Sequence, residues 1–149
     1  MNKVNYQIRN ASLQDIPDII ELSNQLGYPS SESEIRKRLE SIYSSDDHAV
    51  FVAYSLENKV LGWIHVYKHQ SVQSGFFAEI GGFIVSNAFR GIGIGKWLLK
   101  SVEQWTSQKN LFKLRVRSQT KREDAKRFYS KKGFVVTKQQ WVFDKEIKK

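Results

Sequence analysis

The stretch RGIGIGKWLLKSVEQW, residues 90–105, places three glycines at alternate positions directly before a helical pattern of apolar residues. Glycine in a helix costs about 0.5–1 kcal/mol relative to alanine, so the glycines indicate that something approaches the backbone closely. Helix N-termini carry unpaired amide groups and partial positive charge, which bind anions. Arg90 and Lys96 would strengthen such a site. The stretch therefore predicts a phosphate site, with a tight turn that binds no ligand as the alternative.

Two common phosphate motifs do not fit this stretch. A Walker loop has four residues between its glycines and Ser or Thr after its lysine, whereas three residues separate Gly91 from Gly95 and Trp97 follows Lys96. The dinucleotide fingerprint G-x-G-x-x-G also has a different spacing. The phosphate site is therefore of another kind.

The composition is that of a soluble globular chain of one-domain size, with 149 residues, 40% hydrophobic and 26% charged. The absence of cysteine excludes disulfides, thiolate catalysis and cysteine-bound zinc, and agrees with a cytoplasmic location. No apolar run is long enough to cross a membrane, and the N-terminus lacks the pattern of a signal peptide. We therefore expect no membrane partner.

Positive charge is concentrated after the glycine stretch. From Arg90 onward there are 17 Lys and Arg against 5 Asp and Glu, whereas the preceding residues have 7 against 10. This asymmetry favours a polyanionic ligand for the second half, either nucleic acid or a phosphorylated cofactor. For any single lysine, a solvated helix face is the plainer interpretation.

The apolar periodicity predicts a mixed α/β sheet of the α+β kind, in the order β-α-α-β-β-β-α-β-α-β-β. Strands are expected at residues 6–10, 49–55, 60–69, 76–85, 113–118, 134–137 and 139–147. Helices are expected from the Ser12–Asp15 capping box to Gly27, from Ser31 through Ile42, from the glycine stretch to about Lys109, and over 121–132 between a Thr120–Glu123 box and Gly133. The three strands between residues 49 and 85 have no helix between them, so we expect antiparallel neighbours.

Two segments resemble the GNAT superfamily of N-acetyltransferases. VSNAFRGIGIGKWLL, residues 85–99, is similar to the family's acetyl-CoA signature, Arg/Gln-x-x-Gly-x-Gly/Ala after a strand, with Arg90, Gly93 and Gly95 in those places and Gly91 as an extra glycine. AKRFYSKKGF, residues 125–134, resembles the family's A-x-x-F-Y-x-x-x-G-F segment. The resemblance implies a single GNAT domain over residues 1–149 whose mostly antiparallel central sheet is flanked by helices, with acetyl-CoA as cosubstrate and no metal.

The resemblance also implies a set of cofactor-binding residues. The glycines would make room for the pyrophosphate of coenzyme A, and the basic half would suit its phosphates. Backbone amides at the end of the 76–85 strand would hold the pantetheine arm and polarise the thioester carbonyl. Where family members often have an asparagine that helps to hold the cofactor, this chain has Arg122, and arginine suits a phosphate. The predicted set is Phe83, Ile84, Val85, Arg90, Gly91, Gly93, Gly95, Lys96 and Arg122.

Glu79 is the candidate catalytic base. An alkylamine is mostly ammonium at neutral pH and must lose a proton before it attacks a thioester. Glu79 is the only acidic residue between residues 58 and 102, and it stands among apolar neighbours in a predicted strand, where a carboxylate is costly unless paired or functional. A glutamate near a strand end that faces solvent is the alternative. The neighbouring Gly81 and Gly82 suggest a β-bulge or close approach of a ligand.

Tyr129 is the candidate general acid, because family members often use the tyrosine of the F-Y pair. Its spacing from Ala125 also fits a purely structural tyrosine on a core face. The histidines are expected to have no catalytic or metal role, since His65 and His69 lie about 13 Å apart along one strand and His48 is placed in a loop.

The acceptor would lie between the first two helices and the central strands, as in the family. That half carries acidic residues (Glu21, Glu32, Glu34, Asp46, Asp47, Glu79) and aromatic residues (Tyr28, Tyr43, Trp63, Tyr67), which favours a small cationic amine. The expected activity is transfer of an acetyl group to a primary amine by direct attack, with no nucleic-acid partner; a homodimer is left open. The alternatives are a nucleic-acid-binding module and a GNAT fold that binds acyl-CoA without catalysis.

Overall fold

A computed structural model describes residues 5–25, 27 and 29–148. Leu26 and Tyr28, which the sequence places in the first helix and the acceptor site, lie outside the described residues. The chain divides into two compact units, Met1–Val116 and Arg117–Lys149. That residues 1–149 form one domain stays a prediction.

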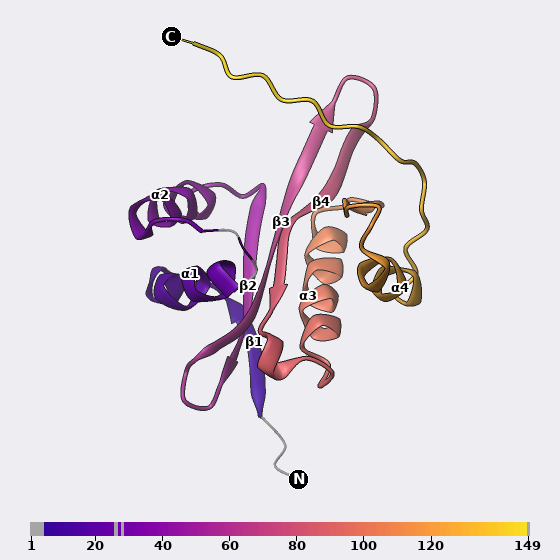
Figure 1. Cartoon of the computed structure of the whole chain (residues 1–149). Coiled ribbons are helices and arrows are strands. Elements are labelled where there is room, and N and C mark those ends of the chain that lie inside the picture. The colour runs from indigo at the N-terminus through magenta and orange to yellow at the C-terminus, as the bar shows by residue number, and fades with distance from the viewer. Residues whose placement is uncertain (1–4, 26, 28, 149) are drawn as a thin grey trace. The chain divides into compact units, whose positions relative to one another are not determined.

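The first unit is built on a five-stranded sheet (Figure 1). Its strands lie in chain order: β1 (Tyr6–Asn10), β2 (His48–Ser55), β3 (Val60–Ser71), β4 (Gly75–Val85) and β5 (Leu114–Val116). Each strand from β1 to β4 is antiparallel to the next, and short turns join β2, β3 and β4. A helical crossover makes β5 parallel to β4. The predicted mixed, mostly antiparallel sheet is confirmed.

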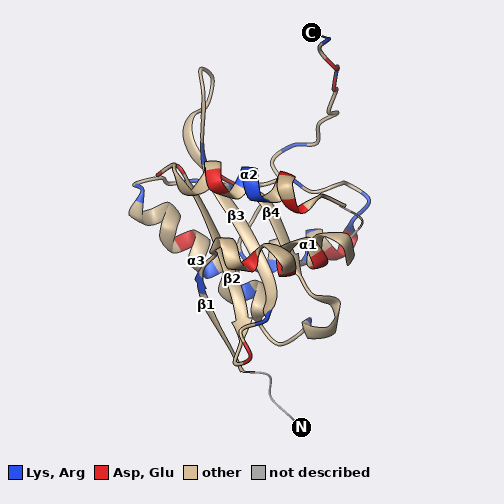
Figure 2. Cartoon of the chain, turned by 90° about the vertical axis from the view of Figure 1, so that its left-hand side faces the viewer, with Lys and Arg blue, Asp and Glu red and all other residues tan. Residues whose placement is uncertain are grey.

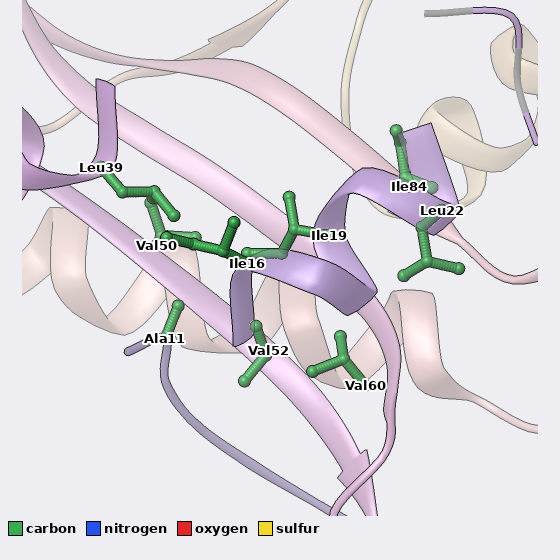
Figure 3. Packing of buried hydrophobic residues seen from close by; sticks show 9 residues of the cluster. All are labelled: Ala11, Ile16, Ile19, Leu22, Leu39, Val50, Val52, Val60 and Ile84. Carbon is green, nitrogen blue, oxygen red and sulfur yellow. The ribbon is translucent and has the colours of Figure 1, made fainter. Parts of the chain in front are cut away.

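Helices cover both faces of this sheet (Figure 1). One face of the sheet packs against α1 (Ile16–Gln25) and α2 (Glu32–Tyr43). The short 3-10 helix η1 (Leu13–Asp15) leads directly into α1. Their apolar side chains meet those of the strands in one cluster, formed by Ala11, Ile16, Ile19, Leu22, Leu39, Val50, Val52, Val60 and Ile84 (Figure 3). The other face carries α3 (Ile94–Gln108), whose Ile94 and Leu98 lie against Gly62. None of the described helices is long and apolar enough to span a bilayer.

The predicted helix starts in the first unit are confirmed. Ser12 and Asp15 form a capping box, and Asp15 also accepts two hydrogen bonds from the Arg9 guanidinium, at 2.7 and 2.8 Å. Burial alone would raise the pKa of Asp15, but the hydrogen bonds from Arg9 and Ser12 hold it below its usual value. The hydroxyl of Ser31 accepts a hydrogen bond from the Glu34 amide at the start of α2.

The second unit contains α4 (Glu123–Lys131). The predicted Thr120–Glu123 capping box is wrong, because residues 119–122 form a turn in which the Arg122 amide donates to the Gln119 carbonyl. The helix therefore begins later, and Arg122 is its N-cap without a side-chain hydrogen bond. Gly133, with φ +92°, ends the helix as expected.

The two predicted C-terminal strands, 134–137 and 139–147, are also wrong. Residues 134–148 have no regular secondary structure, although their β-branched and aromatic residues suit a strand. Val135, Trp141 and Phe143 are exposed, at 80%, 85% and 83%. A strand is stable only within a ladder, and these side chains are not buried against a sheet face in this structure.

Candidate active site

One continuous segment joins β4 to α3. After Val85 come the short helix η2 (Asn87–Phe89), a turn at residues 90–93, and α3, with Gly93 as N-cap. Gly91 and Gly93 have φ values of +83° and +91°, which glycine adopts without strain. A Cβ at Gly91 would have no atom within 4 Å, so conformation rather than crowding requires glycine there. Gly95 lies inside the first turn of α3.

The start of α3 is positive. Its first turn contains no acidic residue, and Arg90 and Lys96 are both exposed beside it. The first amide groups of the helix precede the first N–H to carbonyl bond, which runs from Trp97 to Gly93 at 3.1 Å. These groups together fit a diphosphate, because helix amides and flexible cations bind phosphate oxygens.

Glu79 lies in β4 and is buried, with 7% of its surface exposed. The Tyr67 hydroxyl donates a hydrogen bond to Oε2 of Glu79, and the two residues are register partners across β3 and β4. Glu79 therefore shares the sheet face of Tyr67, and the alternative of a solvent-facing glutamate is wrong. A carboxylate that is buried but hydrogen-bonded can keep its charge and accept a proton.

Gly81 and Gly82 form the predicted β-bulge. The register shifts here, since His65 faces Gly82 while Val66 faces Ile80, which leaves Gly81 as the extra residue. A Cβ at Gly81 would lie 2.8 Å from Nδ1 of His65, and one at Gly82 would lie 2.7 Å from the Trp63 ring. The two glycines thus let aromatic and imidazole rings of β3 lie directly over the bulge, next to Glu79.

A histidine pair completes this face, and sequence reasoning missed it. His48 is not in a loop but begins β2 opposite Tyr67, and its Nδ1 lies 3.0 Å from Nε2 of His65. Burial, and second the charge of His48, lower the pKa of His65 to about 4, so its imidazole is neutral at pH 7. The antiparallel register of the β2–β3 hairpin is the signal that could have paired them.

The end of β4 carries Phe83, Ile84 and Val85, which pair with β3 on one side. On the other side, the ladder with β5 covers only Ala78, Glu79 and Ile80 in the described part of the chain. The last five residues of β4 therefore extend beyond the β5 ladder. This is the place predicted for backbone contacts with the pantetheine arm.

Two predicted residues belong to the second unit and are described within it. Tyr129 lies in α4, with its ring edge-on to Phe128 and Phe134 at centroid distances of 5.3 and 5.4 Å. Burial raises its pKa above the usual value of 10, so the hydroxyl is protonated at neutral pH. Arg122 is exposed, and its Nη2 lies 3.8 Å from Oδ2 of Asp124.

The acidic residues of α2 do not form an open anionic surface. Glu32 and Glu34 pair with Arg36 and Arg38 at 3.2 and 3.7 Å, each one helical turn apart. Along α2, basic residues 36–38 accordingly lie between acidic residues (Figure 2). The two ion pairs of α2 thus reduce the negative charge that the sequence assigned to the acceptor site, whereas Glu79 lies in β4, two residues before Gly81 of the bulge.

Two further features lie apart from the predicted site residues. One is an open groove of about 530 Å³, and none of the predicted site residues lines it. Its lining residues are Lys68, Ser74, Phe76, Lys109, Asn110, Leu111, Phe112 and Lys113. Among the residues that the structure describes, no group of three or more His, Asp or Glu side chains is arranged to bind a metal ion.

Comparison with solved structures shows the same fold. Glucosamine-6-phosphate N-acetyltransferase from Arabidopsis thaliana is 23% identical, with 95% of this chain and 99% of that chain covered at a TM-score of 0.83. The aminoglycoside 6'-N-acetyltransferase AAC(6')-Ih from Acinetobacter baumannii is 18% identical. The match covers 96% of this chain and 99% of that chain, with a TM-score of 0.83. AAC(6')-Iy, in complex with the bisubstrate analog CoA-S-monomethyl-acetylneamine, is 20% identical. The match covers 96% of this chain and 99% of that chain, with a TM-score of 0.84.

A search of curated proteins finds no match to the sequence. The family model described as the acetyltransferase (GNAT) family, however, matches residues 13–134, which include the β4–α3 segment, Glu79 and α4. The chain therefore belongs to the GNAT family of acetyltransferases.

Proposed function

We propose that the protein transfers the acetyl group of acetyl-CoA to the primary amine of a small cationic molecule, by direct attack when both substrates are bound. The observation that carries this proposal is the single segment from β4 to α3. It contains a buried carboxylate, Glu79, at one end and a positive glycine turn at the other. One segment thus supplies both a base and a phosphate site.

The glycine turn and the start of α3 would hold the diphosphate of the cosubstrate. Arg90 and Lys96 would contact its oxygens, and the amides of the first α3 turn would donate hydrogen bonds. Arg122 is exposed, and its guanidinium would suit a phosphate of the cosubstrate. When bound, acetyl-CoA supplies an activated thioester, and the backbone at Phe83, Ile84 and Val85 would orient the arm that carries it.

Glu79 would accept the proton of the substrate ammonium, directly or through water. Tyr67 holds one carboxylate oxygen through its hydroxyl, which fixes the orientation of the group. The deprotonated amine then forms a bond to the thioester carbonyl carbon, the carbon–sulfur bond breaks, and the nitrogen loses its second proton to water as the amide forms. Tyr129 would donate its hydroxyl proton to the departing thiolate and regain a proton from water, and burial, which raises its pKa, keeps the hydroxyl protonated beforehand.

The acceptor would lie on the sheet face of Glu79, beside Trp63 and Tyr67. Aromatic rings bind cations on their faces, and the carboxylate attracts an ammonium group. Within the described residues, the buried Nε1 of Trp63 has no hydrogen-bond partner, and a polar group of the acceptor would satisfy it. Because the α2 glutamates are already paired with arginines, Glu79 would provide the main attraction for the amine.

A thiol-release assay with acetyl-CoA tests the function. The panel of acceptors would include diamines, amino sugars, aminophosphonates, amino acids and peptide N-termini. We expect turnover with small cationic amines and little with peptides. Calorimetry would accompany the assay, and no binding at millimolar acetyl-CoA would reject the proposal.

Two other outcomes would point to the alternative functions. Acetyl-CoA binding without turnover over the whole panel would indicate a GNAT fold that binds acyl-CoA without catalysis. Binding to nucleic acid that weakens steeply with salt, in a protein without affinity for acetyl-CoA, would favour the nucleic-acid module.

A further inference from the structure

We propose that Tyr6 is a positioning residue that holds the glycine turn in its anion-binding orientation. The Tyr6 hydroxyl, on β1, donates a hydrogen bond to the carbonyl oxygen of Ile92 at 3.1 Å, across 86 residues of sequence. A Cβ on Gly93 would lie 3.3 Å from the same hydroxyl. The tyrosine therefore lies directly against the peptide unit that precedes α3. The inference rests on the proposed function, because it concerns the acetyl-CoA site.

The turn needs such a contact because its backbone is intrinsically soft. Gly91 and Gly93 flank Ile92, and both have positive φ. Glycine adopts positive and negative φ about equally well, so neither glycine alone determines which way the Ile92–Gly93 peptide faces. A packed side chain from another strand removes this freedom.

The orientation of this peptide matters for an anion. The peptide is planar and trans, so its carbonyl oxygen and its N–H point in opposite directions. While Tyr6 holds the Ile92 carbonyl, the Gly93 N–H points away from Tyr6. If the peptide turned over, a carbonyl oxygen would take the place of the N–H and repel phosphate. Tyr6 thus prevents a cofactor-repelling state of the turn.

Tyr6 is a donor over the whole neutral range. Burial raises the pKa of its phenol above 10, and a protonated hydroxyl can donate to a carbonyl oxygen, whereas a phenolate cannot. The interaction does not depend on the cofactor, because it joins two parts of the protein. Its effect can therefore be measured in the free protein as well as in the complex.

The test compares Tyr6→Phe with Tyr54→Phe. Tyr54 lies in the neighbouring strand β2, and its hydroxyl donates to Oε1 of Gln7 at 2.9 Å, so the control removes one hydroxyl from the same pair of strands. For Tyr6→Phe we expect the Kd and KM for acetyl-CoA to rise roughly five- to tenfold, as for one lost hydrogen bond. We expect kcat at saturating acetyl-CoA and the KM for the amine to stay within about twofold. Tyr54→Phe should leave the Kd for acetyl-CoA, both KM values and kcat unchanged.

A measurement without cofactor accompanies the kinetics. In the free Tyr6→Phe protein, the amide resonance of Gly93 should shift or broaden through exchange between the two peptide orientations, while that of Tyr54→Phe should match the wild type. Equal Kd values for wild type and Tyr6→Phe, with an unchanged Gly93 resonance, would overturn the proposal for Tyr6 alone. Equal losses in both variants would also overturn it, because they would indicate general damage to β1 and β2. A wild-type protein that does not bind acetyl-CoA would overturn the proposed function itself.

Discussion

Glu79 and Asp15 are both buried carboxylates, but they lie in different surroundings. Glu79 accepts a hydrogen bond from the Tyr67 hydroxyl on the sheet face that also carries the histidine pair. Asp15 shows the contrast, because this buried acid is held by the Arg9 guanidinium and caps a helix start. The surroundings of Asp15 are thus those of a helix cap, whereas Glu79 caps no helix, which agrees with its proposed role as a base.

Replacement of Glu79 by Gln should lower kcat by at least about 100-fold, since general base catalysis contributes a factor of this order or more. The side chain keeps its shape and can still pair with Tyr67, so acetyl-CoA affinity should not change. Steady-state rates between pH 6 and 9 and calorimetry would measure these effects.

Glu57→Gln is the matched control for this prediction. Glu57 lies in the exposed turn between β2 and β3, so its variant removes one carboxylate without touching the sheet face. It should behave as wild type. Turnover by Glu79→Gln that equals the wild type over the whole pH range would exclude Glu79 as the base.

At the scale of elements, the connection from β4 to α3 concentrates positive charge at one helix end. Gly91 and Gly93 let the chain turn tightly with positive φ, and the turn leaves the first amides of α3 without helical partners. The buried stripe Leu98, Leu99 and Val102 anchors the helix to the sheet. The amide end is therefore held rigidly, as an anion site requires.

Arg90→Ala should raise the KM for acetyl-CoA about tenfold, the effect of one lost charge-assisted hydrogen bond, with kcat at saturation nearly unchanged. Lys109→Ala is the control. Lys109 is the C-cap of the same 15-residue helix, roughly 22 Å from its start, and its removal changes the net charge equally. Similar KM increases in both variants, measured at the same ionic strength, would show that net charge rather than the turn attracts the cofactor.

Helix starts and strands differ in how well the local sequence predicts them. Ser12 and Ser31 were identified as helix starts because each cap is made within four residues of the chain. The strand pattern of residues 139–147 was equally clear, yet the segment is not a strand. A cap needs only its own turn, whereas a strand needs a partner that the local sequence does not specify.

For the whole molecule, His65 links stability to pH. Its pKa is about 4 in the folded protein, against 6.5 for an unperturbed histidine. Between these pH values the unfolded chain binds more protons than the folded one, so the free energy of unfolding should decrease as the pH falls from 6.5 to 4. Asp15, whose folded pKa is below 3.8, loses its contribution only at lower pH. The effects of His65 and Asp15 on the free energy of unfolding therefore occur over separate pH ranges.

Urea unfolding at pH 7 and pH 5 would measure this dependence. His65→Gln should be less stable than wild type at pH 7, because it disturbs the pair with His48, but should lose less stability between the two pH values. Gln70→Ala, on the same strand, removes no titratable group; it is the control and should keep the wild-type slope. An unchanged slope in His65→Gln would show that His65 is not the group responsible.

The sequence by itself determined the family, the order of the elements as far as α4, and two parts of the candidate site. The glycine turn and the isolated acid Glu79 are visible because they depend on residues adjacent in the chain. Only the tertiary structure paired His48 with His65, placed Tyr67 on Glu79 and Trp63 over the bulge, and brought Tyr6 to the turn. These contacts depend on strand register and on a link across 86 residues, which no local pattern specifies, because register is set by the packing of whole strands.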